Sequence, residues 1–248
     1  MEPELIEKLI DRASQSRQPE ILFVKRKASS GRRLGVFASS FNPVTCAHLE
    51  LMRGAAGQYS LDEMLALAGT RNADKTQYEC PLERRIQMLL LATREEPRIS
   101  VAVSTSAFFV DMVDPIVANY SPGTEIYFIT GFDTFERILD PEDRYTGRYH
   151  RKFQNRGEAL RYLLARSDLI VAGRKGRGAR EWEALTKREA ESLRTMPEDR
   201  MQFMDFPDDL GERSSSEVRQ RIRDGLGIAG LVPPAAERYI QEHGLYRK

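Results

Sequence analysis

The chain has 248 residues, of which 41% are hydrophobic and 30% are charged, and its formal net charge is +1 at pH 7. This length suits one substantial α/β domain, and the composition is ordinary for a globular protein. The small net charge argues against a protein whose whole surface is built to bind nucleic acid or an anionic membrane.

The N-terminus predicts an amphipathic helix rather than a targeting signal. Its apolar residues follow a helical spacing among four acidic residues within positions 1–17, and both secretory and mitochondrial signals lack such a layout. No apolar run approaches the ~20 residues that a membrane span needs. Cys46 and Cys80 are too few for a disulfide framework, so a reducing compartment is expected. We therefore expect a cytoplasmic protein without a membrane partner.

Short apolar runs recur along the chain and predict strands that are covered on both faces. These runs span residues 33–39, 63–69, 99–104, 125–131, 168–173 and 201–206. Helical patterns lie between them, and their apolar faces include Leu49, Met52, Ala56 and Tyr59 in one helix and Leu82, Ile86, Leu89 and Thr93 in the next. This alternation predicts an α/β fold with a doubly wound parallel sheet, in which ligands bind at the carboxyl ends of the strands.

Residues 140–165 interrupt the alternation. They are basic and aromatic at first and then helical around Ala159–Leu164, and the connection is longer than most. Residues 144–180 hold eleven lysines and arginines against two acidic residues. We expect a single domain with an inserted basic loop near the site, preceded by an N-terminal helical extension over residues 1–30.

The first candidate site is the turn "SSFNPVTCAH" at residues 39–48, which follows a predicted strand. Small residues at a strand end let the backbone approach a ligand, and a helix that begins between Thr45 and His48 would point its free N–H groups at the same place. Such a turn binds anions, and the threonine and histidine add donors for phosphate oxygens. The structural alternative is that Thr45 caps the helix and His48 is held by packing. Zinc at Cys46 and His48 is disfavoured, because two ligands do not close a zinc site.

The second candidate site is "RSSSEVR" at residues 213–219. Ser214 and Glu217 fit a capping box, so a well-capped helix is the structural alternative. The buried stripe expected behind this cap consists of Val218, Ile222 and Leu226. One serine suffices for a cap, whereas three serines followed by Arg219 suit a polyphosphate better.

With both turns in view, the sequence resembles the nucleotidyltransferase superfamily of HxGH type, and within it the nicotinamide or nicotinate mononucleotide adenylyltransferase family. The first turn is similar to the family's GSFNPxTxxH signature and the second to its ISSTxIR signature. "NADKTQYECPLERRIQMLLLA", "YFITGFDTF", "DLIVAGRK" and "LVPPAAERYIQEHGLY" resemble further family segments in the expected order. Ser39 and Ala47 depart from the family's usual residues but remain small.

The resemblance implies a Rossmann-like nucleotidyltransferase domain over residues 31–248. It also implies transfer of AMP from ATP to NMN or nicotinate mononucleotide, which gives NAD or deamido-NAD and pyrophosphate. The expected partners are ATP and a phosphate-bearing small molecule rather than nucleic acid. Mg²⁺ is expected as a cofactor that accompanies ATP, without an assigned protein ligand.

The resemblance also implies a set of site residues. Those expected to act in catalysis are His48, Thr45 and Arg219. Those expected to bind ATP are Ser39, Ser40, Phe41, His48, Gly131, Asp133, Ser214, Ser215, Ser216 and Arg219. Those expected to bind the mononucleotide are Lys75, Arg85, Phe108, Phe109 and Arg174.

Several of these assignments have structural alternatives. Lys75 is otherwise a solvated loop lysine, Arg85 a helix-surface arginine, and Asp133 a helix N-cap. The pair Phe108 and Phe109 could fill a core instead of stacking on the pyridine ring. Two other functions remain open as well, namely another transferase of the superfamily, such as a cytidylyltransferase, and a relative that binds nucleotides or nucleic acid without turnover. The sequence is silent on the oligomeric state.

Overall fold

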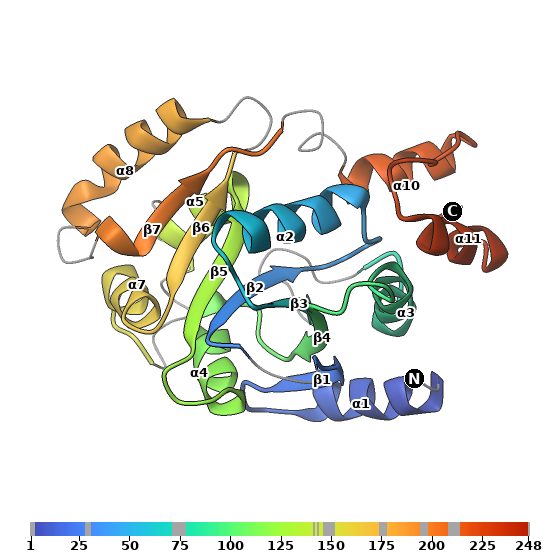
Figure 1. Ribbon diagram of the computed structural model, residues 1–248, viewed down its shortest axis with the longest axis horizontal. Helices are drawn as coiled ribbons and strands as arrows, with labels where there is room; N and C mark the ends of the chain where they lie inside the picture. The colour runs from blue at the N-terminus through green and yellow to red at the C-terminus, as the bar shows by residue number, and fades with distance from the viewer. Residues whose placement is uncertain are drawn as a thin grey trace.

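The computed structural model describes residues 3–27, 31–70, 78–140, 142, 144–145, 152–173, 178–193, 198–207 and 214–247. In this part of the chain a seven-stranded sheet lies between two layers of helices, which confirms the predicted Rossmann-like α/β fold (Figure 1). The strands are β1 (Ile21–Lys25), β2 (Arg33–Ser39), β3 (Glu63–Gly69), β4 (Ile99–Ser104), β5 (Glu125–Gly131), β6 (Asp168–Ala172) and β7 (Met201–Met204). The helices are α1 (Pro3–Gln15), α2 (Cys46–Gln58), α3 (Leu82–Ala92), α4 (Phe109–Asn119), α5 (Phe132–Leu139), α7 (Arg156–Leu164), α8 (Ala179–Leu193), α10 (Ser215–Arg223) and α11 (Pro234–Glu242), with a 3₁₀ turn at Glu198–Arg200.

The sheet has the strand order β1-β4-β3-β2-β5-β6-β7. Only the pair of β1 with β4 is antiparallel among the described strand pairs, and the register aligns Val36 of β2 with Leu65 of β3 and Phe128 of β5. The order of the strands reverses between β2 and β5. In sheets of this kind the crevice beyond the carboxyl ends of the strands at that switch point is the usual binding site.

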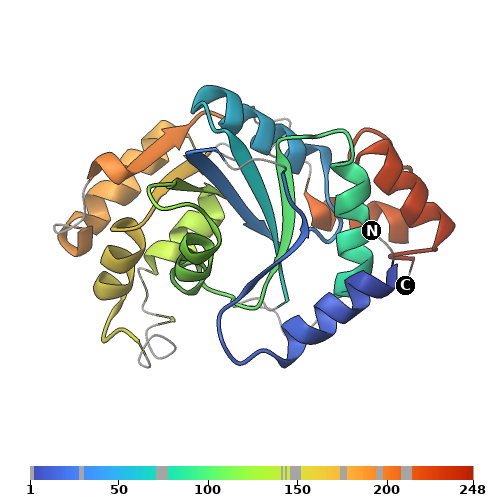
Figure 2. The ribbon, with the colours of Figure 1, turned by 60° about the horizontal axis from the view of Figure 1, so that its bottom comes forward.

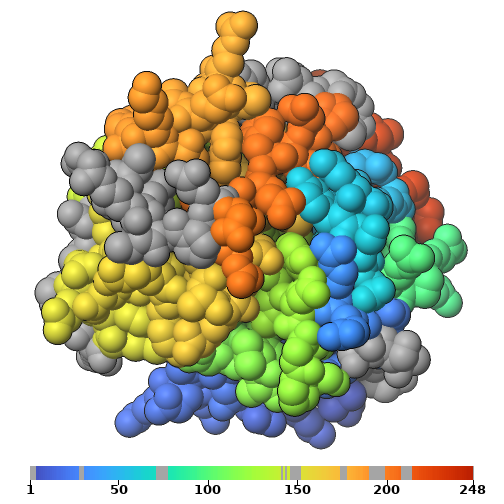
Figure 3. Space-filling model, turned by 60° about the vertical axis from the view of Figure 1, so that its left-hand side comes forward, coloured from blue at the N-terminus to red at the C-terminus, as the bar shows by residue number. Residues whose placement is uncertain are grey.

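Alternate residues of the central strands face opposite helix layers. Phe37 belongs to a buried cluster that includes side chains of α1, α2, α3, α10 and α11. Its neighbour Val36 belongs to a second cluster that includes side chains of α4, α5, α7 and α8. Figure 2 shows α1, α3 and α11 on one side of the sheet and α7 and α8 on the other. Figure 3 shows α7 in yellow and α8 in orange at the end of the molecule where β7 lies.

The predicted strands match the structure closely, with one omission. The four strands from residues 33–39 to 125–131 are confirmed to the residue, while the later two end earlier, at Ala172 and Met204. The strand that the sequence analysis missed is β1. It is short, it follows directly on the amphipathic helix α1, and its partner β4 lies far away in the chain.

The predicted helices are confirmed at α1, α2, α3, α7 and α10. The buried stripe expected on α10 is wrong at Leu226, because the helix ends at Arg223 and Leu226 is exposed. The division of the chain at residue 30 and the inserted loop stay predictions, and most of residues 140–151 lies outside the described part. Among the described helices, none is long and apolar enough to cross a membrane.

Candidate active site

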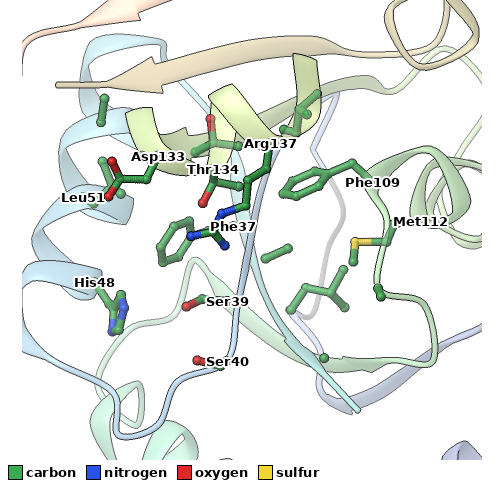
Figure 4. Close-up of a pocket in the computed structure, with 18 of the residues that line it drawn as sticks. Phe37, Ser39, Ser40, His48, Leu51, Phe109, Met112, Asp133, Thr134 and Arg137 are labelled. Carbon is green, nitrogen blue, oxygen red and sulfur yellow. The ribbon is translucent and has the colours of Figure 1, made fainter. Parts of the chain in front are cut away.

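A cavity of about 410 Å³ opens at the carboxyl ends of β2 and β5, where the strand order reverses. Figure 4 shows His48, Ser39 and Ser40 along one side of it and Phe109 and Met112 along the other. The sequence-predicted residues that line it are Ser39, Ser40, Thr45, His48, Phe108, Phe109, Gly131, Asp133, Ser214, Ser215, Ser216 and Arg219. Ala47, one of the small residues in the first turn, lines it too. Two turns that are distant in the sequence therefore meet around one cavity.

The first turn departs from regular backbone at Phe41, whose φ of 44° lies in the left-handed region that non-glycine residues rarely adopt. The Phe41 ring is fully buried and packs edge-on against both Phe37 and His48, with ring centroids 5.8 and 5.2 Å away. Burial of this ring offsets the unfavourable backbone conformation. Phe41 therefore supports the cavity wall from behind, since it is absent from the cavity lining.

Three carbonyl groups of the same turn accept hydrogen bonds from distant side chains. Arg85 Nη1 donates to the Ser40 carbonyl at 2.6 Å, and Arg219 Nη1 donates to the Asn42 carbonyl at 2.6 Å. Ser215 Oγ donates to the Pro43 carbonyl at 2.8 Å. Because buried carbonyls are costly to leave unpaired, these bonds stabilise the shape of the turn. They also tie the second predicted site directly to the first.

Thr45 and His48 form a capping box at the start of α2. The Thr45 side chain accepts from the His48 N–H, and the Thr45 N–H donates to His48 Nδ1 at 3.0 Å. Since a backbone N–H can only donate, Nδ1 acts as the acceptor and the neutral ring carries its proton on Nε2. Thr45 therefore caps α2, as the structural alternative predicts. The same arrangement also orients His48 as a hydrogen-bond donor at the cavity.

The second turn begins α10, and Ser214 caps it by accepting from the Glu217 N–H at 3.1 Å. The Ser214 half of the predicted capping box is therefore confirmed. Ser215 and Ser216 lie in the first turn of the helix, where backbone N–H groups attract anions. Arg219 contacts three acceptors, since it also donates to Ser216 Oγ at 3.3 Å and to Glu79 at 2.8 Å. These bonds hold the Arg219 guanidinium in place at the cavity wall.

Asp133 enters the cavity from α5. The cap of α5 is Gly131, so the alternative that Asp133 is the N-cap is wrong. A side chain added at Gly131 would meet open space, so a ligand has room to approach the backbone at the end of β5. The Asp133 carboxylate lines the cavity, where it could accept hydrogen bonds from ribose hydroxyls or bind a cation.

The two adjacent phenylalanines combine both of their predicted roles. Phe109 packs edge-on against Phe128 of the sheet at 5.2 Å, and Phe108 packs edge-on against Tyr145 at 5.6 Å. Both also line the cavity. The core therefore fixes their rings while one surface of each remains available to a ligand.

Arg85 lies in neither of the two places predicted for it, the mononucleotide site and the helix surface. It is 2% exposed rather than on the helix surface, and it is absent from the cavity lining. Its guanidinium lies 4.0 Å from the centroid of the Tyr78 ring, and burial lowers its pKa from the ordinary value. Arg85 donates a hydrogen bond to the Ser40 carbonyl, so it stabilises the turn from the side away from the cavity. The other predicted cations, Lys75 and Arg174, lie outside the described residues.

Several residues that shape the site were not predicted from the sequence. Arg137 and Thr134 line the cavity from α5, on the same face as Asp133. Tyr246 donates to Asn42 Oδ1 at 2.9 Å from the far end of the chain. For Arg137 a signal existed, because it follows Asp133 by one helical turn. For Tyr246 and Glu79 no local spacing gave such a signal, since their partners lie far away in the chain.

Comparisons with known proteins agree with this geometry. A model described as cytidylyltransferase-like matches residues 36–221. A protein of Carboxydothermus hydrogenoformans, named a probable nicotinate-nucleotide adenylyltransferase, is 30% identical over 223 residues, which cover 88% of this chain and 100% of that protein. A protein of Moorella thermoacetica with the same name is 29% identical over 224 residues, which cover 87% of this chain and 92% of that protein.

Solved structures show the same fold. The nicotinic acid mononucleotide adenylyltransferase of Plasmodium falciparum, solved as a complex with NaAD, has a TM-score of 0.61 and 17% sequence identity to this chain. The likeness covers 87% of this chain and 98% of that chain. At this identity the structural comparison speaks for the fold alone.

Proposed function

Since the chain belongs to the cytidylyltransferase-like family, and within it to the nicotinate-nucleotide adenylyltransferases, we propose that it transfers the adenylyl group of ATP to a pyridine mononucleotide. Nicotinate mononucleotide is the preferred acceptor in this proposal, because the similar proteins are named for it. The products are then deamido-NAD and pyrophosphate. NMN, which would give NAD, is the competing acceptor.

The observation that carries the proposal is the joining of the two turns at the switch point of the sheet. The 2.8 Å bond from Ser215 to the Pro43 carbonyl places the start of α10 beside the start of α2. Two helix N-termini with serine, threonine and histidine donors thus border one cavity. Such an arrangement suits a ligand with several phosphate groups better than it suits a single anion.

The reaction needs no nucleophile from the protein. An oxygen of the acceptor phosphate forms a bond to the α-phosphorus of ATP, while the bond from that phosphorus to the pyrophosphate oxygen breaks. The protein must hold two polyanions in line and stabilise the charge that grows on the leaving group. Correct positioning alone can contribute about 7–11 kcal/mol to lowering such a barrier.

The roles follow from the placement of the side chains. In this proposal the His48 Nε2–H and the Thr45 hydroxyl donate to phosphate oxygens in the transition state. Ser39 and Ser40 border the α-phosphate, while Ser214, Ser215, Ser216 and Arg219 bind the β- and γ-phosphates. Gly131 and Asp133 border the adenosine, Phe41 supports His48 from behind, and Phe108 and Phe109 stack on the pyridine ring. Lys75 and Arg174 stay predicted contacts of the mononucleotide, whereas Arg85 would act on it through the turn.

A divalent cation, which we propose to be Mg²⁺, would neutralise phosphate charge when ATP is bound. Within the described part of the chain, no group of three or more His, Cys, Asp or Glu side chains could hold a metal ion. A cavity with one carboxylate in its described lining fits Mg²⁺, because this ion is usually bound through substrate phosphates and one or two carboxylates. Asp133 is the carboxylate among the described lining residues that could take part.

The test is an acceptor and donor panel. Purified protein with Mg²⁺ would be incubated with ATP or CTP and with nicotinate mononucleotide, NMN, phosphopantetheine or a sugar phosphate, and pyrophosphate release would be measured. We expect release with ATP and nicotinate mononucleotide. Release only with CTP or with another acceptor would reassign the reaction. Salt-dependent RNA binding without any release would favour the non-catalytic alternative.

A further inference from the structure

Among the described residues, few charged side chains line the cavity, although the proposed reaction brings two polyanions into it. Among the described lining residues these are Asp133, Arg137 and Arg219, besides His48. Arg219 already donates to Glu79, to the Asn42 carbonyl and to Ser216. These bonds hold it at the start of α10, where the proposed triphosphate site lies. Arg137 is the other arginine among these residues, and it lines the cavity from α5.

The face of α5 at the cavity carries Asp133, Thr134 and Arg137. Their spacing places them on one side of the helix, and all three line the cavity. In Figure 4 the Arg137 side chain extends from α5 between the side with His48 and Ser39 and the side with Phe109. The cation therefore reaches the region between the phosphate-binding turns and the aromatic end of the cavity.

The aromatic end is mostly apolar in its described side chains, which include Phe108, Phe109, Val110, Met112 and Leu160. Tyr145 adds a hydroxyl there. Such a surface accommodates a flat aromatic ring, and a guanidinium at its edge adds a planar pair of donors for one anionic substituent. A carboxylate accepts two parallel N–H bonds from arginine, whereas a carboxamide offers one oxygen and no charge.

We propose that Arg137 is the residue that selects the acceptor, by pairing with the carboxylate of the nicotinate ring. The inference rests on the proposed adenylyl transfer and specifies its acceptor. In the low-dielectric environment of the cavity an ionic bidentate pair is stronger than a neutral hydrogen bond, so Arg137 favours nicotinate mononucleotide over NMN. The two acceptors share the ribose and the phosphate. A comparison between them therefore reports only on the ring substituent.

The experiment compares both acceptors in the wild-type protein and in Arg137→Met, which keeps a long apolar stem without charge. We expect kcat/KM for nicotinate mononucleotide to fall about 10–100-fold, the effect of losing a hydrogen bond to a charged group, with kcat/KM for NMN within about twofold. The KM for ATP should stay within the same twofold range. Arg137→Lys keeps the charge without the fork and should retain part of the preference.

A matched control and a binding measurement separate this result from general damage. Arg98→Leu removes an exposed arginine that precedes β4, at the opposite end of the strands from the cavity, and should change neither acceptor. Calorimetric titration of each mononucleotide without turnover should show the same selective loss in Arg137→Met. Equal losses for both acceptors would assign Arg137 to the shared phosphate and overturn the proposal. Unchanged kcat/KM for nicotinate mononucleotide in Arg137→Met would overturn it too. A wild-type protein that uses neither acceptor would instead contradict the proposed function.

Discussion

At the scale of single residues, His48 combines a structural and a chemical role that can be separated. Its Nδ1 accepts from the Thr45 N–H and closes a capping box, which leaves Nε2 as the protonated nitrogen. Histidine is unusual at this position of a capping box, where glutamate or glutamine is the common choice. The glutamine variant should therefore preserve the cap while removing the imidazole donor.

We predict that His48→Gln lowers kcat about 10²–10³-fold, because a transition-state donor of this kind contributes about that much. Its thermal unfolding midpoint should match the wild type. His48→Ala should show the same loss of kcat and, in addition, lose about 1 kcal/mol of stability with the cap. The measurement is pyrophosphate release together with calorimetric unfolding of both variants. Wild-type turnover in His48→Gln would remove His48 from the mechanism.

At the scale of elements, a carboxylate from elsewhere in the chain pairs with two arginines of α10, one of which lines the cavity. Glu79 accepts from Arg219 Nε at 2.8 Å with one oxygen and from Arg223 Nη1 at 2.9 Å with the other. Arg219 lines the cavity and Arg223 does not. Glu79 is 42% exposed, so its ion pairs contribute little to stability, and their value lies in orientation.

We predict that Glu79→Gln lowers kcat/KM for ATP about tenfold, since a small misplacement of a positioned group is enough for a loss of that order. Arg223→Gln is the matched variant, because it leaves Glu79 paired with Arg219 alone. It should change kcat/KM for ATP by less than about twofold. Steady-state kinetics with varied ATP would check both, and equal effects of the two substitutions would show that Glu79 acts on α10 as a whole rather than on Arg219.

The same elements show how much the sequence could predict. Continuous apolar runs located the bounds of β2 to β5 to the residue, because strands that are buried on both faces of a parallel sheet consist of such runs. Thr45, His48 and the three serines were found because capping and anion binding need those residue types at a helix start. The placement of Arg85 behind the turn was not predicted, since its partner Ser40 is 45 residues away and no local pattern encodes that contact.

At the scale of the whole molecule, contacts over long sequence separations converge on the turn at residues 40–43. Ser215 and Arg219 reach it across 172 and 177 residues, and Tyr246 reaches Asn42 across 204 residues. Such contacts form only when the sheet and both helix layers are in place. The shape of the first turn is thus a property of the complete fold rather than of its own ten residues.

Tyr246 offers a test of that statement from the far end of the chain. It is 6% exposed, burial raises the pKa of its hydroxyl, and it donates to the side-chain oxygen of Asn42, which is 5% exposed. We predict that Tyr246→Phe destabilises the protein by about 1–3 kcal/mol, because it leaves a buried acceptor unpaired. In a chain of this size each kcal/mol lowers the unfolding midpoint by about 2–4 °C.

The same substitution should lower kcat several-fold, although Tyr246 is absent from the cavity lining, because Asn42 precedes the start of α2 and its carbonyl anchors Arg219. Tyr239→Phe is the matched control. Its hydroxyl accepts a hydrogen bond from Arg84 at 2.9 Å on the partly exposed surface between α3 and α11. Its removal should leave kcat unchanged and should alter the free energy of unfolding by no more than about 1 kcal/mol. If Tyr246→Phe unfolded earlier but kept full kcat at a temperature where it is folded, the C-terminal segment would stabilise the fold without shaping the catalytic turn.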